Sequence, residues 1–143
     1  HVVGKEYLYL IWNGEHRNPF YTDRALFYPR ELDMEKISAA LPHFLGTHDF
    51  RAFMASGSEI AETTRTITDI RAEREGDFVR MFVSADGFLY NMVRIIVGTL
   101  LEVSEGRLSA ADLPSVIAGG KRESAGRTAP PEGLYLHRVF LRR

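Results

Sequence analysis

Residues 78–103 of the chain, FVRMFVSADGFLYNMVRIIVGTLLEV, hold a strand pattern followed directly by a helix pattern. The strand is predicted from Phe78 to Ala85, because alternate residues there are apolar and share one face. These residues are Val79, Met81, Val83 and Ala85. Asp86-Gly87 favours a turn. The helix that follows, from about Leu89 to Val103, is apolar on nearly every face, so we expect it in the core of the domain.

Three further strands are predicted outward from this unit. Arg65–Glu75 is polar and alternating, and Glu75-Gly76-Asp77 favours a tight hairpin connection to the next strand. Glu6–Trp12 is aromatic and β-branched, which indicates a strand with both faces partly covered. Leu134–Leu141 is the last predicted strand.

Helices and loops are expected between the strands. Asp33 is a good N-cap for a helix that Gly46 can end, and Pro42 should kink or shorten that helix. Ser109–Asp112 has the form of a capping box, which opens a helix that Gly119-Gly120 closes. The remaining segments are predicted as a turn or short helical piece and three loops: His48–Ala55, then Asn13–Arg30, Ser56–Thr63 and Lys121–Pro131.

This order of elements predicts one α+β domain, with a mixed, largely antiparallel sheet and helices packed on one face.

The chain has 143 residues, is 45% hydrophobic and contains no cysteine, which excludes disulfides and thiolate metal sites and fits a reducing compartment. We therefore expect a cytoplasmic protein. No apolar run reaches the roughly 18 residues that span a membrane. Net charge is −1, but residues 106–143 carry seven Lys or Arg against three Asp or Glu, so any electrostatic footprint for RNA is local.

Arg94 lies midway along the most apolar predicted helix. A buried guanidinium keeps its charge and needs a carboxylate or several acceptors. No acid occurs at helical spacing, since the neighbours three and four residues away are Tyr90, Asn91, Val97 and Gly98. Arg94 therefore either extends its head group to water or finds a partner elsewhere.

Tyr7 and Tyr9 share one face of the first predicted strand. Most aromatic residues in strands pack in the core. The alternative is a ring that stacks on a base taken out of its helix. The five histidines show no ligand spacing, and we expect no metal site. The loop Ala125–Gly133 is either a structural connection or one wall of a substrate cleft.

Several stretches together resemble the tRNA pseudouridine synthase A family. They span the chain from Lys5 to the last predicted strand: Lys5–Tyr9, Leu45–Phe53, Arg65–Ile67, Gly87–Gly98, Ala125–Pro130 and Gly133–Leu136. Each motif is modest alone, and their shared order makes the similarity specific.

The resemblance implies an enzyme that converts uridine to pseudouridine in the anticodon stem-loop of tRNA, without cofactor or metal, and that works as a homodimer. By the same resemblance, Tyr7 stacks on the target base, and Arg94 pairs with an aspartate that attacks the flipped nucleotide. We also predict RNA contacts from six basic residues: Lys5, Arg51, Arg65, Lys121, Arg122 and Arg127. The last three lie in the predicted loop Lys121–Pro131, which we call the basic loop.

The family's nucleophilic aspartate lies in a Gly-Arg-Thr-Asp motif that this sequence lacks. Gly126-Arg127-Thr128 is followed by Ala129 and belongs to a different motif. The interpretation is that residues 1–143 are the C-terminal half of the catalytic domain, excised from a longer protein and inactive alone. A non-catalytic RNA-binding or dimerisation module is the alternative. The chain also departs from the family at Tyr90, Asn91, Ile95 and Arg127.

Overall fold

Six strands form one mixed sheet in the computed structural model, which describes residues 1–142. The strands are β1 (Val2–Trp12), β2 (Leu26–Phe27), β3 (Gly46–Asp49), β4 (Thr64–Glu75), β5 (Phe78–Ala85) and β6 (Leu134–Leu141). Their order is β2-β1-β5-β4-β3, and β6 also pairs with β1. Only the short β1–β2 pairing is parallel, so the predicted mixed, largely antiparallel sheet is confirmed.

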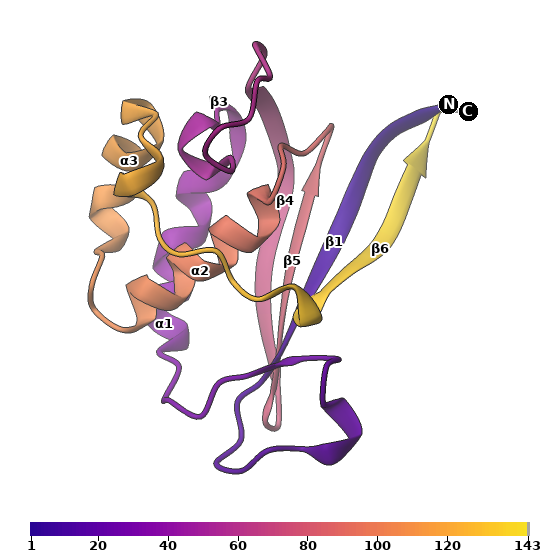
Figure 1. The fold of residues 1–143 in the computed structure, drawn as a ribbon, viewed down its shortest axis with the longest axis vertical. Coiled ribbons are helices and arrows are strands. Elements are labelled where there is room, and N and C mark those ends of the chain that lie inside the picture. Colours follow the sequence, from indigo (N-terminus) through magenta and orange to yellow (C-terminus); the bar gives the residue numbers. More distant parts are fainter. Residues whose placement is uncertain (143) are drawn as a thin grey trace.

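Three helices cover the same face of this sheet: α1 (Met34–Ala40), α2 (Met92–Ser104) and α3 (Leu113–Gly119) (Figure 1). In α2 every residue except Arg94 and Glu102 is buried, which confirms the core helix that the sequence predicts. Its side chains pack against the alternating apolar residues of β1 and β5, and together they form the centre of the hydrophobic core. Each buried Leu, Ile or Val there stabilises the fold by roughly 1.5–3 kcal/mol.

Local sequence signals explain where the helices begin and end. The Asp33 side chain accepts a hydrogen bond from the Lys36 backbone N–H and caps α1. Pro42 shortens this helix as predicted, because the α-helical part ends at Ala40 and a 3-10 turn follows. Helix α2 begins three residues later than predicted, because Asn91 adopts a left-handed conformation with φ 62°.

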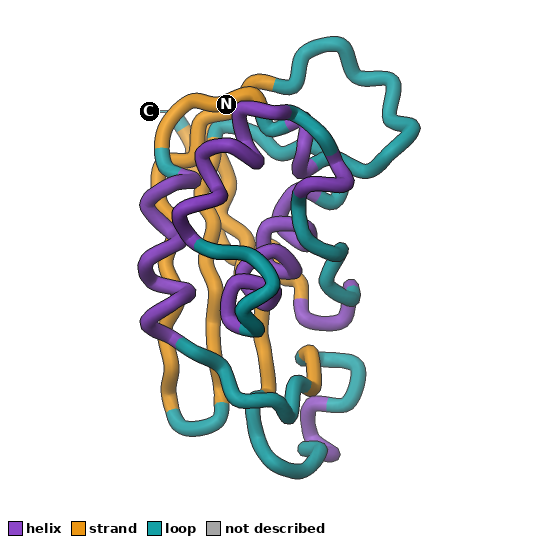
Figure 2. Tube along the Cα trace, turned by 90° about the vertical axis from the view of Figure 1, so that its left-hand side faces the viewer, coloured by secondary structure: helices purple, strands orange, loops and turns teal. Residues whose placement is uncertain are grey.

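Two predictions for the irregular segments were wrong in part. The stretch His48–Ala55 does contain a helical piece, the 3-10 turn Arg51–Phe53, but it also contains strand residues. Part of the stretch predicted as a turn or helical piece, together with Gly46 and Thr47, forms β3, which pairs with β4 from Gly46–Ile67 to Asp49–Thr64. The sequence signal was weak because this strand is four residues long and polar. The predicted loop Asn13–Arg30 likewise contains β2, whose two residues pair with Ile11 and Trp12 at the end of β1. Figure 2 shows this loop projecting from the end of the molecule opposite the two chain ends.

Strand β6 lies at the edge of the sheet, where β1 is its only partner within residues 1–142. Its far side therefore offers backbone N–H and C=O groups that no described strand uses. Exposed apolar side chains gather on β6 and on the start of β1: Val2, Val3, Leu136, Val139 and Leu141. Both termini lie together at this edge, where the Arg142 backbone N–H donates to the His1 carbonyl over 2.9 Å (Figure 1).

Candidate active site

Tyr7 and Arg94, which are 87 positions apart in the sequence, line one cleft of about 540 Å³. Tyr7 comes from β1. Arg94 comes from the first turn of α2 and not from its middle as the sequence predicted, because the helix begins only at Met92. The remaining walls come from the turn before α2, the start of α2, the segment that leads into β6 and the first residue of β6: Phe88, Leu89, Tyr90, Asn91, Met92, Val93, Pro131 and Leu134. The fold thus brings together the two residues that the sequence singles out for chemistry.

Arg94 is held by neutral acceptors. Its Nε–H donates to the Ala129 carbonyl oxygen over 2.7 Å, and its Nη1 donates to the Asn91 side-chain oxygen over 3.1 Å. Within residues 1–142 no carboxylate lies within 4.0 Å of the guanidinium. The charge therefore stands at the cleft without an anionic partner from the described chain.

The two tyrosines of β1 have different environments. Tyr9 is fully buried, its hydroxyl donates to the Pro130 carbonyl oxygen over 2.6 Å, and burial raises its pKa far above the ordinary value. This is the core-packing role that aromatic residues in strands usually have. Tyr7 is only half-buried, and its ring meets Phe88 edge-on with 5.0 Å between the ring centroids. Its ring is therefore available to a planar group in the cleft.

The segment Gly126–Pro130 crosses α2 in close backbone contact, which sets the position of Ala129. A Cβ at Gly98 would lie 1.7 Å from the Arg127 carbonyl oxygen, so no larger residue fits at that point of the helix. The Ala129 backbone N–H also donates to the Arg94 carbonyl over 2.9 Å, which makes the contact reciprocal. Of the loop Ala125–Gly133, only Pro131 lines the cleft, so this loop acts mainly through the backbone carbonyl that Ala129 offers to Arg94. Asn91, Gly98 and Ala129 were not recognised as site residues, although a glycine inside an apolar helix was a usable signal.

The cations predicted to contact RNA lie in several places. Lys5 is exposed and pairs in register with Ala85 of β5. Arg65 is half-buried, and its Nη1 donates to the backbone oxygens of Thr64 and Glu62. Arg51 is exposed, and its 3-10 turn packs against the turn that contains Arg122. The structure thus brings Arg51 next to the basic loop.

Within the basic loop the cations have different surroundings. Lys121 is exposed. Arg122 donates to the Gly126 carbonyl over 2.7 Å and to the Thr128 hydroxyl over 3.1 Å, so it braces the loop. Arg127 forms an ion pair with Glu105 through two hydrogen bonds of 3.1 and 2.9 Å. Their predicted RNA contacts stay predictions, and Lys121 is the cation of this loop that is most open to a phosphate.

Glu105 is the centre of a charge cluster at the C-terminal end of α2. Its side chain is 8% exposed and also has Arg30 and Arg107 within 4.0 Å. The hydrogen bonds from Arg127 hold the pKa of Glu105 below its usual value, against the effect of burial. Tyr28 also donates to Glu105, and burial together with this carboxylate raises the pKa of Tyr28 to about 12.

A second buried carboxylate lies on the sheet face away from the helices. Burial alone would raise the pKa of Glu6, but hydrogen bonds with His137, Ser84 and Arg71 hold it below its usual value. The arginine also lies over the Phe82 ring, with its guanidinium carbon 4.1 Å from the ring centroid. This network accounts for a charged residue at a buried strand position.

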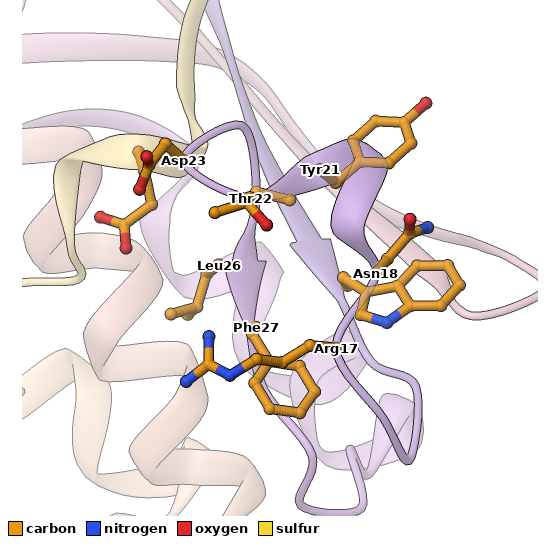
Figure 3. Close-up of a pocket in the computed structure, with 10 residues that line it drawn as sticks. Arg17, Asn18, Tyr21, Thr22, Asp23, Leu26 and Phe27 are labelled. Carbon is orange, nitrogen blue, oxygen red and sulfur yellow. The ribbon is translucent and has the colours of Figure 1, made fainter.

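A smaller pocket of about 260 Å³ lies inside the long loop that follows β1. Figure 3 shows Arg17 over the Phe27 ring, with 4.8 Å between the guanidinium carbon and the ring centroid. Asp23 lies nearby at φ 61°, a second left-handed residue other than glycine.

Among residues 1–142 no group of three or more His, Asp or Glu side chains is placed to hold a metal ion. None of the helices in this range is long and apolar enough to cross a membrane.

Comparison with known proteins gives this cleft a context. The model of the tRNA pseudouridine synthase family matches residues 40–140, and the chain belongs to that family. The chain is 50% identical over 137 residues to the tRNA pseudouridine synthase A of Acetivibrio thermocellus. It is 45% identical over 136 residues to that of Bacillus licheniformis and 45% identical over 139 residues to tRNA pseudouridine synthase A 2 of Clostridium perfringens.

These matches cover 95–97% of this chain but only 55–57% of each relative. The chain therefore spans about half the length of the curated relatives it matches.

Proposed function

We propose that this chain is the C-terminal half of a tRNA pseudouridine synthase that isomerises uridine in the anticodon stem-loop. The observation that carries the proposal is the cleft in which a half-buried aromatic ring, Tyr7, faces a helix-borne cation, Arg94, in a chain of this family. Each residue comes from a stretch that resembles the family, and the fold supplies the geometry that joins them.

The reaction fixes what these groups are needed for. The bond between N1 of uracil and C1′ of ribose breaks, and a bond between C5 and C1′ forms. A proton leaves C5 and another is added at N1, so the atoms balance without an oxidant or reductant. Tyr7 offers a surface on which the flipped base can stack. Arg94 offers a planar cation that fits a carboxylate.

A nucleophile must come from outside the described residues. Arg94 has no carboxylate partner within residues 1–142, and we propose that the catalytic aspartate of the other half pairs with it. The matched relatives have room for such a half, since nearly half of their length lies outside the alignment. The apolar edge at β6 suits its docking, because a further strand would use the edge N–H and C=O groups and cover Leu136 and Val139.

The partners follow from the same proposal. The substrate is tRNA, the protein acts in the cytoplasm, and two copies form a homodimer. An RNA-binding or dimerisation module without catalysis is the competing function, favoured by the exposed β6 edge, which a second copy could equally cover.

The test uses the full-length protein and an unmodified tRNA transcript. Because pseudouridine has the same mass as uridine, the tRNA is treated after incubation with a carbodiimide that tags pseudouridine. Mass mapping should then find the tag in the anticodon stem-loop, and no tag when Arg94 is replaced by alanine. RNA binding by the full-length protein without any pseudouridine would reject the enzyme and favour the module.

A further inference from the structure

We infer that Asn91 is a positioning residue that aims the Arg94 guanidinium at the cleft. The inference rests on the proposed function, since it assigns to Arg94 a carboxylate that enters the cleft from outside the described residues. Two features carry it: the backbone conformation of Asn91 and the use of its side chain.

Asn91 stands at the N-cap of α2 but does not cap the helix. An N-cap asparagine usually has extended backbone, and its side-chain oxygen accepts from a backbone N–H two or three residues on. Here φ is 62°, and the side chain makes no capping hydrogen bond. The oxygen accepts from Arg94 Nη1 over 3.1 Å instead. The left-handed backbone of Asn91 and the absence of a capping hydrogen bond therefore accompany a single side-chain contact, the one with Arg94.

The position of Arg94 makes such a contact necessary. Arg94 lies in the first turn of α2, where the helix dipole disfavours a cation. The turn is anchored on both sides of Asn91, because the Ala55 N–H donates to the Tyr90 carbonyl over 3.1 Å and the Ile95 N–H donates to the Asn91 carbonyl over 2.9 Å. A rigid backbone therefore holds the acceptor in place.

The two acceptors also determine which N–H groups of the Arg94 guanidinium stay free to bind a carboxylate. The Ala129 carbonyl takes the Nε–H, and Asn91 takes one N–H of Nη1. The donors that remain lie at the Nη1–Nη2 end of the fork, on a residue that lines the cleft. One N–H of Nη1 and both of Nη2 thus remain for a carboxylate that enters the cleft, and both neighbours that set this geometry are uncharged.

The experiment compares matched substitutions at the two left-handed residues other than glycine in the full-length protein. Asn91→Gly keeps the backbone conformation but removes the acceptor, and it should lower kcat for tRNA about 10-fold with KM within about twofold of wild type. Asp23→Gly makes the same backbone change at φ 61° in the smaller pocket and should leave kcat and Tm unchanged. Wild-type kcat in Asn91→Gly, or an equal loss in Asp23→Gly, overturns the inference.

The variant Asn91→His provides a further test, because the pH dependence of its kcat should differ from that of wild type only if Asn91 positions Arg94. Histidine tolerates the left-handed region, and its neutral ring can accept from Arg94 while its protonated ring cannot. The kcat of this variant should fall, relative to wild type, as the pH drops through about 6.5. A ratio to wild type that does not change with pH contradicts the positioning role.

A measurement that needs no turnover separates this inference from the proposed function. In nuclear magnetic resonance spectra of the full-length protein, exchange of the Arg94 Nη1 protons, which Asn91 accepts from, with solvent should become about 10-fold faster in Asn91→Gly. If wild-type protein makes no pseudouridine but shows this change, the function fails and the positioning stands. If the exchange rate is unchanged, the positioning fails whatever the activity.

Discussion

The two ends of helix α2 both carry a charge that the helix dipole disfavours, and they deal with it differently. At the N-terminal end Arg94 lies in the first turn, where the dipole is positive. At the C-terminal end Glu105 follows the last turn, where the dipole is negative. Three arginines lie within 4.0 Å of Glu105, whereas Arg94 has two neutral acceptors and no carboxylate within residues 1–142.

We propose that this difference separates a structural charge, Glu105, from a functional one, Arg94. The ion pairs of Glu105 are complete inside the chain, so they contribute to folding and to the pH dependence of stability. The charge of Arg94 is oriented but not neutralised, an arrangement that costs stability unless something else binds there. The following predictions test this contrast.

The largest effect expected is complete loss of activity in residues 1–143 taken alone. Neither Tyr7 nor Arg94 is a nucleophile, and no carboxylate of the described chain lies beside Arg94 to attack the nucleotide. Tritium release from tRNA labelled at C5 of uracil, or mass mapping after a derivatisation that tags pseudouridine, should show no turnover above background. Turnover by the pure chain would show that the site is complete without a further carboxylate.

In the full-length protein, Arg94→Lys should lower kcat about 100-fold or more while Tm changes by less than about 2 °C. Lysine keeps the positive charge but loses the planar fork that fits a carboxylate. Arg127→Lys is the matched change at the other end of α2, and it should lower Tm and leave kcat near wild type. Losses of Tm and kcat in the same proportion would assign Arg94 a structural role as well.

Two substitutions of Tyr7 should distinguish the contribution of its ring to tRNA binding from the contribution of its hydroxyl to the reaction rate. Tyr7→Phe keeps a stacking surface and should retain most tRNA binding, whereas Tyr7→Leu should weaken binding by roughly 1–3 kcal/mol. If the hydroxyl transfers a proton, Tyr7→Phe alone should lower the rate roughly 100-fold. Binding titrations and single-turnover rates measure the two effects. Wild-type values in both variants would return Tyr7 to core packing.

Glu105→Gln should destabilise the full-length protein by about 2 kcal/mol and leave kcat near wild type. The value lies between those of exposed and buried ion pairs, because Arg127 is 41% exposed. Pairing lowers the pKa of Glu105 from its ordinary value of 4.5, so the stabilisation is complete above that pH and is lost as the pH falls below it. Denaturant unfolding at several pH values should show the difference from wild type shrinking in acid. A difference that does not change with pH would exclude the carboxylate as its source.

Pattern and burial arguments could predict much of this structure. The alternation in β5 and the long apolar run of α2 predicted these elements, because their own residues carry the signal. β2 and β3 could not be predicted in this way, since strands of two and four residues owe their form to the neighbour they pair with. The site shows the same division: the charge of Arg94 in an apolar helix was visible in the sequence. The acceptor at Ala129 depends on a loop crossing that only the folded chain shows.

The smallest effect expected concerns RNA binding by the basic loop. Lys121 is exposed, whereas Arg127 forms an ion pair with Glu105. Lys121→Ala should therefore make the slope of log affinity against log salt concentration shallower by about 0.7–0.9, which is the contribution of one phosphate contact. Arg127→Ala should leave this slope unchanged and lower Tm. Titration of an anticodon stem-loop with the full-length protein at two salt concentrations measures both. Equal reductions in the two variants would show that Arg127 leaves Glu105 to contact RNA. Wild-type slopes in both would mean that these charges serve solubility, as most surface charges do, and that tRNA binds elsewhere.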